Sequence, residues 1–532
     1  MTMTIIFPPI IPKLYQYFKK HPWLSCLIAN TIFFAIFILF IPIRYESNDD
    51  IAMAHLARMG EPHLIFINII ISTFLSTLYN LCNSFEWYTL FLIVTQFVSC
   101  TIISKTIACS KRHNDHKYLI ICELVILYLF ETTILTSLQF TTTAGILAIS
   151  GLLQLCNTKK KQWIGILLFT IASLIRFDAA MLCGLSFVFI YPLWIYLHGF
   201  DKRLFIALTL CVILSSAFQY YNNYYYHTDK EWGEFIEYTK VRGSINDSPN
   251  NWRAVNHLPP SVAKETYELF TWYFFPDKNI LNLDILKQIN HTIIKDTYYK
   301  NIPFVKMLHN VPSGLMDFSW ELLALLPLFL CNIIFCKNNK ERWLWILALI
   351  AVPLIVSFIS LQSYCKTRVF LCAYFTIILF SAECSTYQKA PFRIKELSLL
   401  LLFIPLAIII YNHYQDFPTK ASKQTTEKGI DFTNYYIAYL SPWELGENDT
   451  NTIWIGWATG MPCIPTIHSY LELIDNPDYQ ITINSDCYNL IQKQLSASIY
   501  HSYGIKAKPV IVKYTEKSIT FYLQNKKITL TH

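Results

Sequence analysis

The stretch WLSCLIANTIFFAIFILFIPI, residues 23–43, decides the class of fold. It contains no charged residue and is long enough to cross the hydrocarbon core of a bilayer, which takes about 20 apolar residues in a helix. It is too long for the apolar core of a signal peptide, and no small-residue cleavage site follows it. We therefore expect a retained first transmembrane helix. Lys13, Lys19 and Lys20 precede it and predict an N-terminus on the inner side.

The composition of the whole chain agrees with this first segment. The 532 residues are 54% hydrophobic and only 15% charged, whereas soluble proteins have about 25% charged residues. These values exclude a soluble domain, a disordered chain and a disulfide scaffold. The net charge of +7 comes largely from short loops between apolar runs, so it carries topological information and indicates no nucleic-acid partner. The sequence has no nucleotide-binding glycine loop and no zinc-type Cys or His spacing.

The apolar runs predict a mainly α, polytopic membrane protein with about eleven spans. We expect these at residues 23–43, 88–109, 118–137, 141–156, 163–175, 179–198, 204–221, 319–336, 343–361, 369–384 and 397–412. Residues 64–82 are also apolar, but counting them as a span would place Lys111, Arg112 and Lys117 outside. Their polar interruptions favour an interfacial or partly re-entrant helix.

With this choice the N-terminus lies inside and the C-terminus outside. The predicted inner segments then hold far more Lys and Arg than the short outer loops. The predicted transmembrane domain is 1–412, including outer loops 44–87 and 222–318, and residues 413–532 form a small extracytoplasmic α/β domain. Stretches 452–458, 510–514 and 518–523 have strand-like patterns. In the tail, Cys463 and Cys487 form either a disulfide or two free thiols.

An acidic pair, Asp49 and Asp50, follows the first span in Ser47-Asn48-Asp49-Asp50. It lies in the first turn of a short predicted helix that is capped by Ser47 or Asn48 and also contains His55. Acids in a first turn are favoured by the helix dipole, so a structural role suffices to explain them. The functional alternative is a general base with an orienting or metal-binding carboxylate.

Three cations stand at outer helix ends, against the positive-inside distribution. Arg176 lies between two short apolar runs, and Lys366 and Arg368 precede a later span. In a structural interpretation, Arg176 snorkels to the interface or pairs with Asp178, and Lys366 and Arg368 anchor to lipid headgroups. In a functional interpretation, the three cations clamp a phosphate, for which guanidinium geometry is suited.

Other polar residues allow further interpretations. Glu123 and Glu131 lie near one face of the third span, where they could line the cavity of Asp49 or form a cation path. Loop 222–318 is rich in Tyr and Trp, which suit an interfacial belt or sugar stacking, and it contains His257 and His291.

Together these features resemble the GT-C class of polytopic glycosyltransferases, which use polyprenyl-phosphate-linked donors. The acidic pair resembles the pair that this class carries after its first span. Glu61-Pro62-His63-Leu64 resembles the element that opens its interfacial helix, and Arg176 and Lys366-Thr367-Arg368-Val369 resemble its later outer cations. The topology matches over residues 20–410.

The resemblance implies a role for each of these residues. Asp49 would be the base that deprotonates the acceptor hydroxyl, and Asp50 would orient it or bind a metal. Arg176, Arg368 and Lys366 would hold the donor phosphate. Further candidates for lining the cavity are Glu131, His63 and His55. A divalent cation, Mg or Mn, would be held by Asp50 and Glu131, although the loop at residues 138–143 lacks the second outer acid that many relatives carry.

The implied partners are a polyprenyl-phosphate sugar, a glycan or lipid acceptor and membrane lipids. The chain also resembles uncharacterised bacterial membrane proteins through Asn48-Asp49-Asp50 and through Trp232-Gly233-Glu234-Phe235 leading to Arg242. This predicts a multi-pass protein of the bacterial inner membrane, active on its outer face in envelope glycan or glycolipid assembly. Two other functions stay open. One is a transporter or flippase of a lipid-linked glycan whose polar path consists of Glu123, Glu131, Arg176 and Arg368. The other is a glycan polymerase or ligase in which outer-loop arginines and a histidine, His257 or His291, carry the chemistry.

Overall fold

The fold comes from a computed structural model of the chain. The structure describes residues 21–41, 43–46, 48–109, 117–157, 161–246, 251–272, 274, 276–297, 315–336, 338–362, 366–384, 401, 403–404, 407–408, 411, 430–431, 460–463, 467–477, 479–514 and 518–525. Most of the described residues belong to helices, so the predicted mainly α fold is confirmed.

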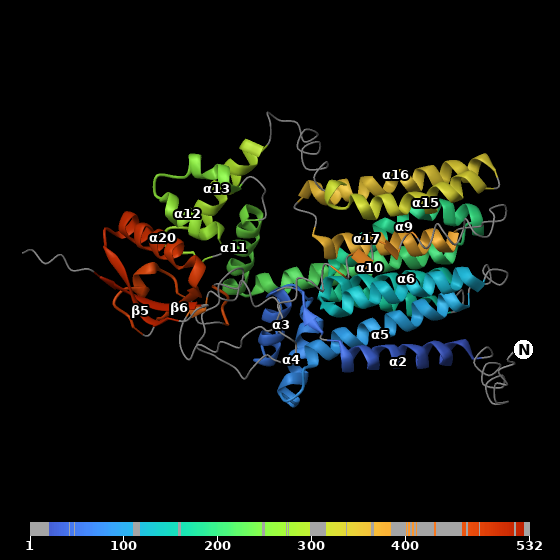
Figure 1. Cartoon of the computed structure of the whole chain (residues 1–532), viewed down its shortest axis with the longest axis horizontal. Helices are drawn as coiled ribbons and strands as arrows, with labels where there is room; N and C mark the ends of the chain where they lie inside the picture. The colour runs from blue at the N-terminus through green and yellow to red at the C-terminus, as the bar shows by residue number, and fades with distance from the viewer. Residues whose placement is uncertain are drawn as a thin grey trace, which may run out of the picture.

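Ten of the helices form a bundle in which most axes run side by side (Figure 1). They fall at all but the last of the predicted spans, and residues 397–412 lie mostly outside the described residues. The ten are α2 (Pro22–Phe40), α5 (Trp87–Ala108), α6 (Lys117–Thr136), α7 (Phe140–Asn157), α8 (Gln162–Ile175), α9 (Phe177–His198), α10 (Lys202–Thr228), α15 (Ser319–Phe335), α16 (Asn339–Gln362) and α17 (Thr367–Cys384). Seven are long and apolar enough to cross a membrane, while α8 and α15 are shorter apolar helices.

Helix α7 is the centre of the bundle, because it packs against α5, α8, α9 and α17 and most of its side chains are buried. Small residues allow its close contact with α8. A Cβ atom at Gly151 would lie 2.9 Å from the carbonyl oxygen of Gly165, and one at Gly165 would lie 2.8 Å from that of Gly151. Glycines at such a contact let two backbones approach, as is common between membrane helices.

Two short helices occupy the end of the bundle where α5 and α7 begin. Helix α3 (Asn48–Arg58) leads through Gly60 to α4 (Ile69–Leu81), whose N-cap Asn68 accepts a hydrogen bond from the Ile70 amide at 3.1 Å. With 13 residues, α4 is too short to span the hydrocarbon core. It runs across the bundle end rather than along it (Figure 1). Ile70, Phe74 and Leu81 are exposed on it.

The segment between α10 and α15 was expected to be a loop, but much of it is helical. It contains α11 (Lys230–Asn246), η2 (Asn251–His257), α12 (Lys264–Thr271) and α13 (Leu283–Thr297). A buried cluster that includes Tyr238, Tyr267 and Leu286 joins these elements. A core of its own explains why aromatic residues of this segment such as Tyr238 and Tyr267 are buried.

The C-terminal region has the predicted small α/β architecture. Its four-stranded sheet has the order β3 (Ile430–Asp431), β4 (Ile481–Asn484), β6 (Ser518–Asn525) and β5 (Ala507–Tyr514), and α20 (Ser485–Tyr503) packs against it. The β3–β4 pair is parallel and the other two pairs are antiparallel. The predicted strands at 510–514 and 518–523 are confirmed, whereas 452–458 lies outside the described residues.

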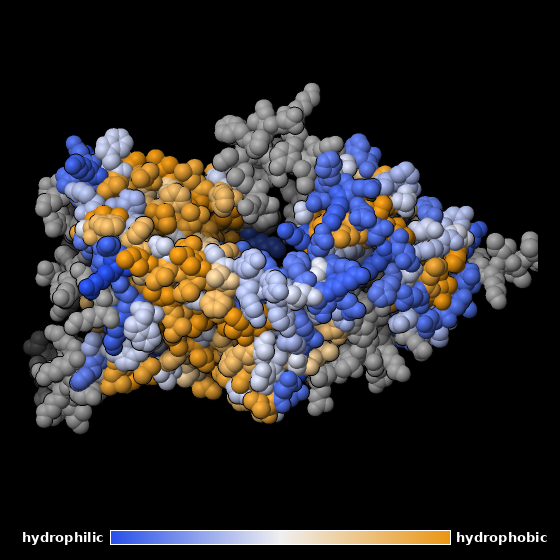
Figure 2. Space-filling view, turned by 180° about the vertical axis from the view of Figure 1, so that it is seen from behind, coloured by the Kyte–Doolittle hydropathy of each residue, from blue (hydrophilic) through white to orange (hydrophobic). Residues whose placement is uncertain are grey.

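The helices α11–α13 and the C-terminal sheet region pack together. We call them the outer unit, after the side that the sequence predicts for them; it consists of β3 and the described residues within 230–297 and 460–525. Buried Asp277 joins the two parts, because its Oδ2 accepts hydrogen bonds from the Tyr470 amide and the Tyr503 hydroxyl, each at 2.7 Å. Figure 2 shows a largely apolar surface over the bundle, a largely polar one over the outer unit, and a recess between them. The boundary between residues 412 and 413 lies outside the described residues and stays a prediction.

Candidate functional site

The acidic pair occupies the first turn of α3, and a short parallel pairing fixes where that turn lies. Strand β1 (Arg44–Tyr45) pairs with β2 (Ser137–Leu138), so the chain leaving α2 meets the chain entering α7. The Glu46 amide continues the pairing with a 3.1 Å hydrogen bond to the Leu138 carbonyl. As a result, α3 begins beside the N-terminus of α7. The predicted caps, Ser47 and the side chain of Asn48, lie outside the described residues.

Asp50 is fully buried and is fixed by two donors from other helices. Its Oδ1 accepts hydrogen bonds from the Tyr88 hydroxyl at 2.9 Å and from the Phe140 amide at 3.0 Å. The second donor is the first residue of α7, where the helix dipole favours an acidic oxygen. Burial raises the pKa of Asp50 to about 8, and the nearby Asp49 carboxylate adds to this, against the opposing effect of its hydrogen bonds. At neutral pH this carboxyl group therefore holds its proton most of the time.

Asp49 faces a different partner. Its Oδ2 lies 3.4 Å from Nη2 of Arg368, in an ion pair between side chains that are 17% and 15% exposed. The pair joins residues that are far apart in the sequence, and it lies at the start of α17. Cys372, one turn further along α17, packs so closely on Gly145 of α7 that a Cβ atom there would collide with its sulfur. This contact holds α17 against α7 and sets the position of Arg368.

Two further charged groups surround the Asp49–Arg368 pair. Lys366 is exposed and directly precedes α17. Glu46, which was not predicted as a site residue, interacts electrostatically with Asp49, Arg368 and Lys366. Desolvation raises the pKa of Glu46 to about 7, while Arg368 acts in the opposite direction. The sequence held only a weak signal for Glu46, namely an acid in the turn before the acidic pair.

Arg176 is connected to this cluster through one aromatic residue. It lies in the extended link between α8 and α9, with its guanidinium carbon 5.6 Å from the ring centroids of both Phe66 and Phe140. The amide of that same Phe140 binds Asp50. Arg176 also pairs with Asp178 at 3.3 Å, but Asp178 is 77% exposed, so this surface pair contributes little. The structure thus brings Arg176, Asp49, Asp50, Arg368 and Lys366 to one end of the bundle.

Glu131 lies elsewhere, in the interior of the bundle on α6. It is fully buried, and both carboxyl oxygens lack a hydrogen-bond partner among the described residues. It interacts electrostatically with Cys100 and Tyr128, which are themselves hydrogen-bonded to Asn30 of α2. His55 is partly buried in the last turn of α3. Neither residue is connected to Asp49 by a described contact.

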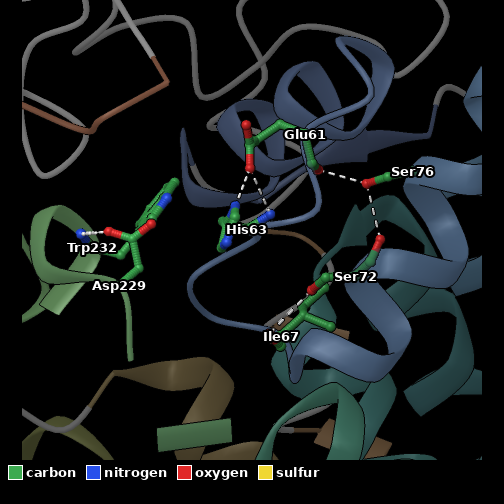
Figure 3. A network of polar contacts seen from close by, with 7 residues as sticks. All are labelled: Glu61, His63, Ile67, Ser72, Ser76, Asp229 and Trp232. Carbon is green, nitrogen blue, oxygen red and sulfur yellow. Dashed lines mark hydrogen bonds and ion pairs between the residues drawn. The ribbon is translucent and has the colours of Figure 1, made fainter. Parts of the chain in front are cut away.

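His63 forms a close pair with Glu61 in the turn between α3 and α4. The Glu61 Oε1 accepts a 3.0 Å hydrogen bond from the His63 amide and is bound to Nδ1 of the ring. Figure 3 shows this pair beside Trp232 of α11. The Ser76 hydroxyl of α4 is hydrogen-bonded to the carbonyl oxygens of Glu61 and Ser72 and so ties the turn to α4. The ring of His63 stacks on Trp232, with centroids 4.3 Å apart. The thiol of Cys463, which is free, hydrogen-bonds to Glu61.

These residues do not fit the divalent cation that the resemblance implied. Within the described parts of the chain, no three His, Cys, Asp or Glu side chains lie close enough together to share a metal ion. Asp50 uses Oδ1 for two protein donors, and Glu131 is in the bundle interior. A magnesium or manganese site would need several oxygen ligands in one place.

The sequence as a whole matches no known protein-family model and no curated protein. Among solved structures, those of ArnT from Cupriavidus metallidurans bound to undecaprenyl phosphate and in the apo state are similar to it. Each alignment covers 94% of this chain and 98% of that chain with a TM-score of 0.37, at 12% and 11% sequence identity respectively.

Proposed function

We propose that this protein is a membrane glycosyltransferase that moves a sugar from a polyprenyl-phosphate-linked donor to an acceptor on the outer face of the membrane. The Asp49–Arg368 ion pair carries the proposal, because it combines a carboxylate and a guanidinium at the end of an apolar bundle. Arg176 supports it from the other side of Phe140. An acid and two arginines at this depth suit a reaction between a lipid-anchored phosphate and a polar acceptor.

The cations bind and stabilise the lipid phosphate in this mechanism. Arg368, Lys366 and Arg176 are the groups available for the phosphodiester, since all three lie at the bundle end and each is at least partly accessible. When the sugar leaves, the lipid phosphate gains negative charge. Fixed guanidinium donors stabilise that charge more in the transition state than in the ground state, which accelerates the reaction.

Asp49 is the base in this mechanism. It takes the proton of the acceptor hydroxyl, whose oxygen attacks the anomeric carbon of the sugar. The bond between that carbon and the phosphate oxygen breaks, and its electron pair stays on the lipid phosphate. Asp50 positions Asp49, because its hydrogen bonds to Tyr88 and Phe140 fix the first turn of α3. When the donor binds, its phosphate takes the place of Asp49 at the Arg368 guanidinium, and Asp49 then becomes available to accept the proton of the acceptor hydroxyl.

The decisive experiment is Asp49→Asn in the full-length protein, assayed with undecaprenyl-phosphate hexoses and pentoses. We expect transfer to fall by about 10²–10⁴-fold, the usual contribution of a general base. Asp284→Asn is the matched control, because Asp284 is also an acid in a helix first turn but is exposed on α13. Equal thermal midpoints would show that both variants fold. Full transfer activity in Asp49→Asn would contradict the assigned base.

The second candidate is a transporter of a lipid-linked glycan, and buried Glu131 favours it. A carboxyl group without a hydrogen-bond partner inside a bundle is typical of ion or proton paths. Transport of a fluorescent lipid-linked glycan across proteoliposomes, lost in Glu131→Gln and kept in Asp49→Asn, would support it. The polymerase or ligase alternative depends on His257 and His291, which are exposed in the outer unit.

The cellular setting belongs to the same proposal. The excess of Lys and Arg in alternate loops supports an outer-facing site, and the sequence resemblance supports a bacterial inner membrane. The polar outer unit beside the apolar bundle supports an acceptor that approaches from the aqueous side (Figure 2). The sequence resemblance supports a role in envelope glycan or glycolipid assembly.

A further inference from the structure

The Glu61–His63 pair lies between the reacting groups and the outer unit. Phe66, three residues after His63, contacts Arg176, which is part of the proposed donor site. On its other side, His63 stacks on Trp232 and lies near Tyr225, with ring centroids 5.9 Å apart. Cys463 of the outer unit binds Glu61. The pair therefore links the segment that contacts Arg176 to the outer unit.

The hydrogen bonding of the pair leaves one ring nitrogen available. Glu61 binds the His63 amide and Nδ1, which fixes the ring and its tautomer. Nε2 has no hydrogen-bond partner among the described residues, and the two side chains are 18% and 17% exposed. Because the ring is partly exposed, Nε2 can bind a group from outside the chain. In the neutral ring, Nε2 carries a lone pair that accepts a hydrogen bond.

The charge and the aromatic rings around His63 Nε2 indicate which class of ligand could bind there. The Glu61 carboxylate disfavours a second anion at this position, so a phosphate is a poor fit. Burial acts to raise the pKa of Glu61, but its hydrogen bonds with His63 outweigh this and leave the pKa below the usual range. A neutral, hydroxyl-rich ligand beside the partly exposed ring of Tyr225 matches both features, because sugars combine hydroxyl donors with apolar C–H faces.

We propose that Glu61 and His63 form an acceptor subsite in which His63 Nε2 accepts a hydrogen bond from a sugar hydroxyl of a glycan acceptor. This inference rests on the proposed function. It deepens that function by giving the acceptor a chemical class, a neutral sugar unit, and a position three residues before Phe66, which contacts Arg176. His63 is here a binding residue, and Glu61 is a positioning residue that acts through it.

The test uses the full-length protein with undecaprenyl-phosphate sugars as donors and octyl-linked mono- and disaccharides as acceptors. His63→Phe keeps a ring that can stack on Trp232 but loses both nitrogens. We expect its KM for the octyl glycoside to rise about tenfold, with kcat and the KM for the donor nearly unchanged. His63→Gln supplies an amide and should recover part of the loss. Glu61→Gln should raise the same KM less, since it can still accept from His63.

His198→Phe is the matched control. His198 also stacks on a tryptophan, Trp194, with centroids 4.0 Å apart, but it lies at the opposite end of α9 from Arg176. It should leave both KM values unchanged. Saturation-transfer NMR of octyl glycoside binding without donor gives a readout that does not need turnover, and His63→Phe should weaken that signal.

The outcomes separate the two levels of inference. If the wild type transfers sugar but His63→Phe leaves the acceptor KM and the NMR signal unchanged, the subsite is wrong and the proposed function stands. A fall in kcat alone, with thermal midpoint lowered in parallel, would make the pair a structural contact and overturn the subsite. If the wild type transfers from none of the donors, the proposed function fails instead.

Discussion

Asp50 and Glu131 are both fully buried carboxyl groups, but their surroundings differ. Asp50 accepts hydrogen bonds from Tyr88 of α5 and from Phe140 at the N-terminus of α7. Glu131, on the neighbouring α6, has no hydrogen-bond partner among the described residues. A buried polar group without a partner costs about 1–3 kcal/mol by mutational measures, so the two acids have opposite energetic roles.

This difference teaches that burial alone does not identify a functional acid. The satisfied acid, Asp50, lies beside the partly buried ion pair of Asp49 and Arg368 and supports it. The unsatisfied acid lies among Asn30, Cys100 and Tyr128, apart from that pair. We therefore assign the chemistry to the bundle end and test the interior acid separately.

After Asp49→Asn, the largest effect on activity is expected for Arg368→Ala. Losing a fixed guanidinium at the departing phosphate should lower kcat by about 10²–10³-fold, as for other preorganised donors of charge stabilisation. Arg368→Lys should recover only part, because an ammonium cannot make the bidentate contact. Single-turnover transfer from an undecaprenyl-phosphate sugar measures the loss in both Arg368 variants. Arg342→Ala, in the first turn of α16, is the control, and an equal loss in both variants would refute a specific role.

The next largest effect is a loss of stability, which is expected for Asp50→Ala but not for Asp50→Asn. Asp50→Ala leaves the Tyr88 hydroxyl and the Phe140 amide without their acceptor, and should lower the free energy of unfolding by about 1–3 kcal/mol. Asp50→Asn keeps the accepting oxygen and should stay close to the wild type. Thermal or denaturant unfolding in detergent measures both. A stable Asp50→Ala variant would show that these hydrogen bonds do not support the site.

A pH series sharpens the same comparison. The pKa of Asp50 is raised to about 8, so the folded state keeps a proton that the unfolded chain releases at about pH 4. The folded state therefore binds more protons across this window, and stability falls as pH rises from about 4 to 8. Asp50→Asn should make the thermal midpoint less dependent on pH. Glu46, with a pKa raised to about 7, leaves a residual slope. An unchanged slope would contradict the burial of Asp50.

The smallest effect on activity is expected for Glu131→Gln. If Glu131 takes no part in transfer, activity should change less than about threefold, well under the effect of losing a general base. The amide also avoids an unpartnered carboxylate, so stability should be equal or higher. Transfer assays and thermal midpoints measure both. A loss comparable to that of Asp49→Asn would move the functional acid into the bundle and favour the transporter.

Much of the fold follows from local sequence patterns. Apolar runs of span length predict the bundle helices, since each run must bury its backbone polar groups in a helix when it crosses lipid. Alternating patterns predict the strands at 510–514 and 518–523. The acidic pair in a helix first turn and the outer cations are also readable, because charges beside apolar runs stand out. The helices of the 230–297 segment were missed, since their apolar residues build a local core of their own.

Only the tertiary structure decided how these residues are used. The local pattern does not distinguish Asp49 from Asp50, to which only the resemblance gives different roles. In the structure, the β1–β2 pairing turns Asp50 onto the N-terminus of α7 and leaves Asp49 to Arg368. Contacts between helices that are far apart in the sequence, such as that of Gly145 with Cys372, place Arg368 beside Asp49. They also connect Phe140 to Arg176 and His63 to Trp232. Hydropathy is a property of each segment by itself, whereas a site depends on which segments pack together.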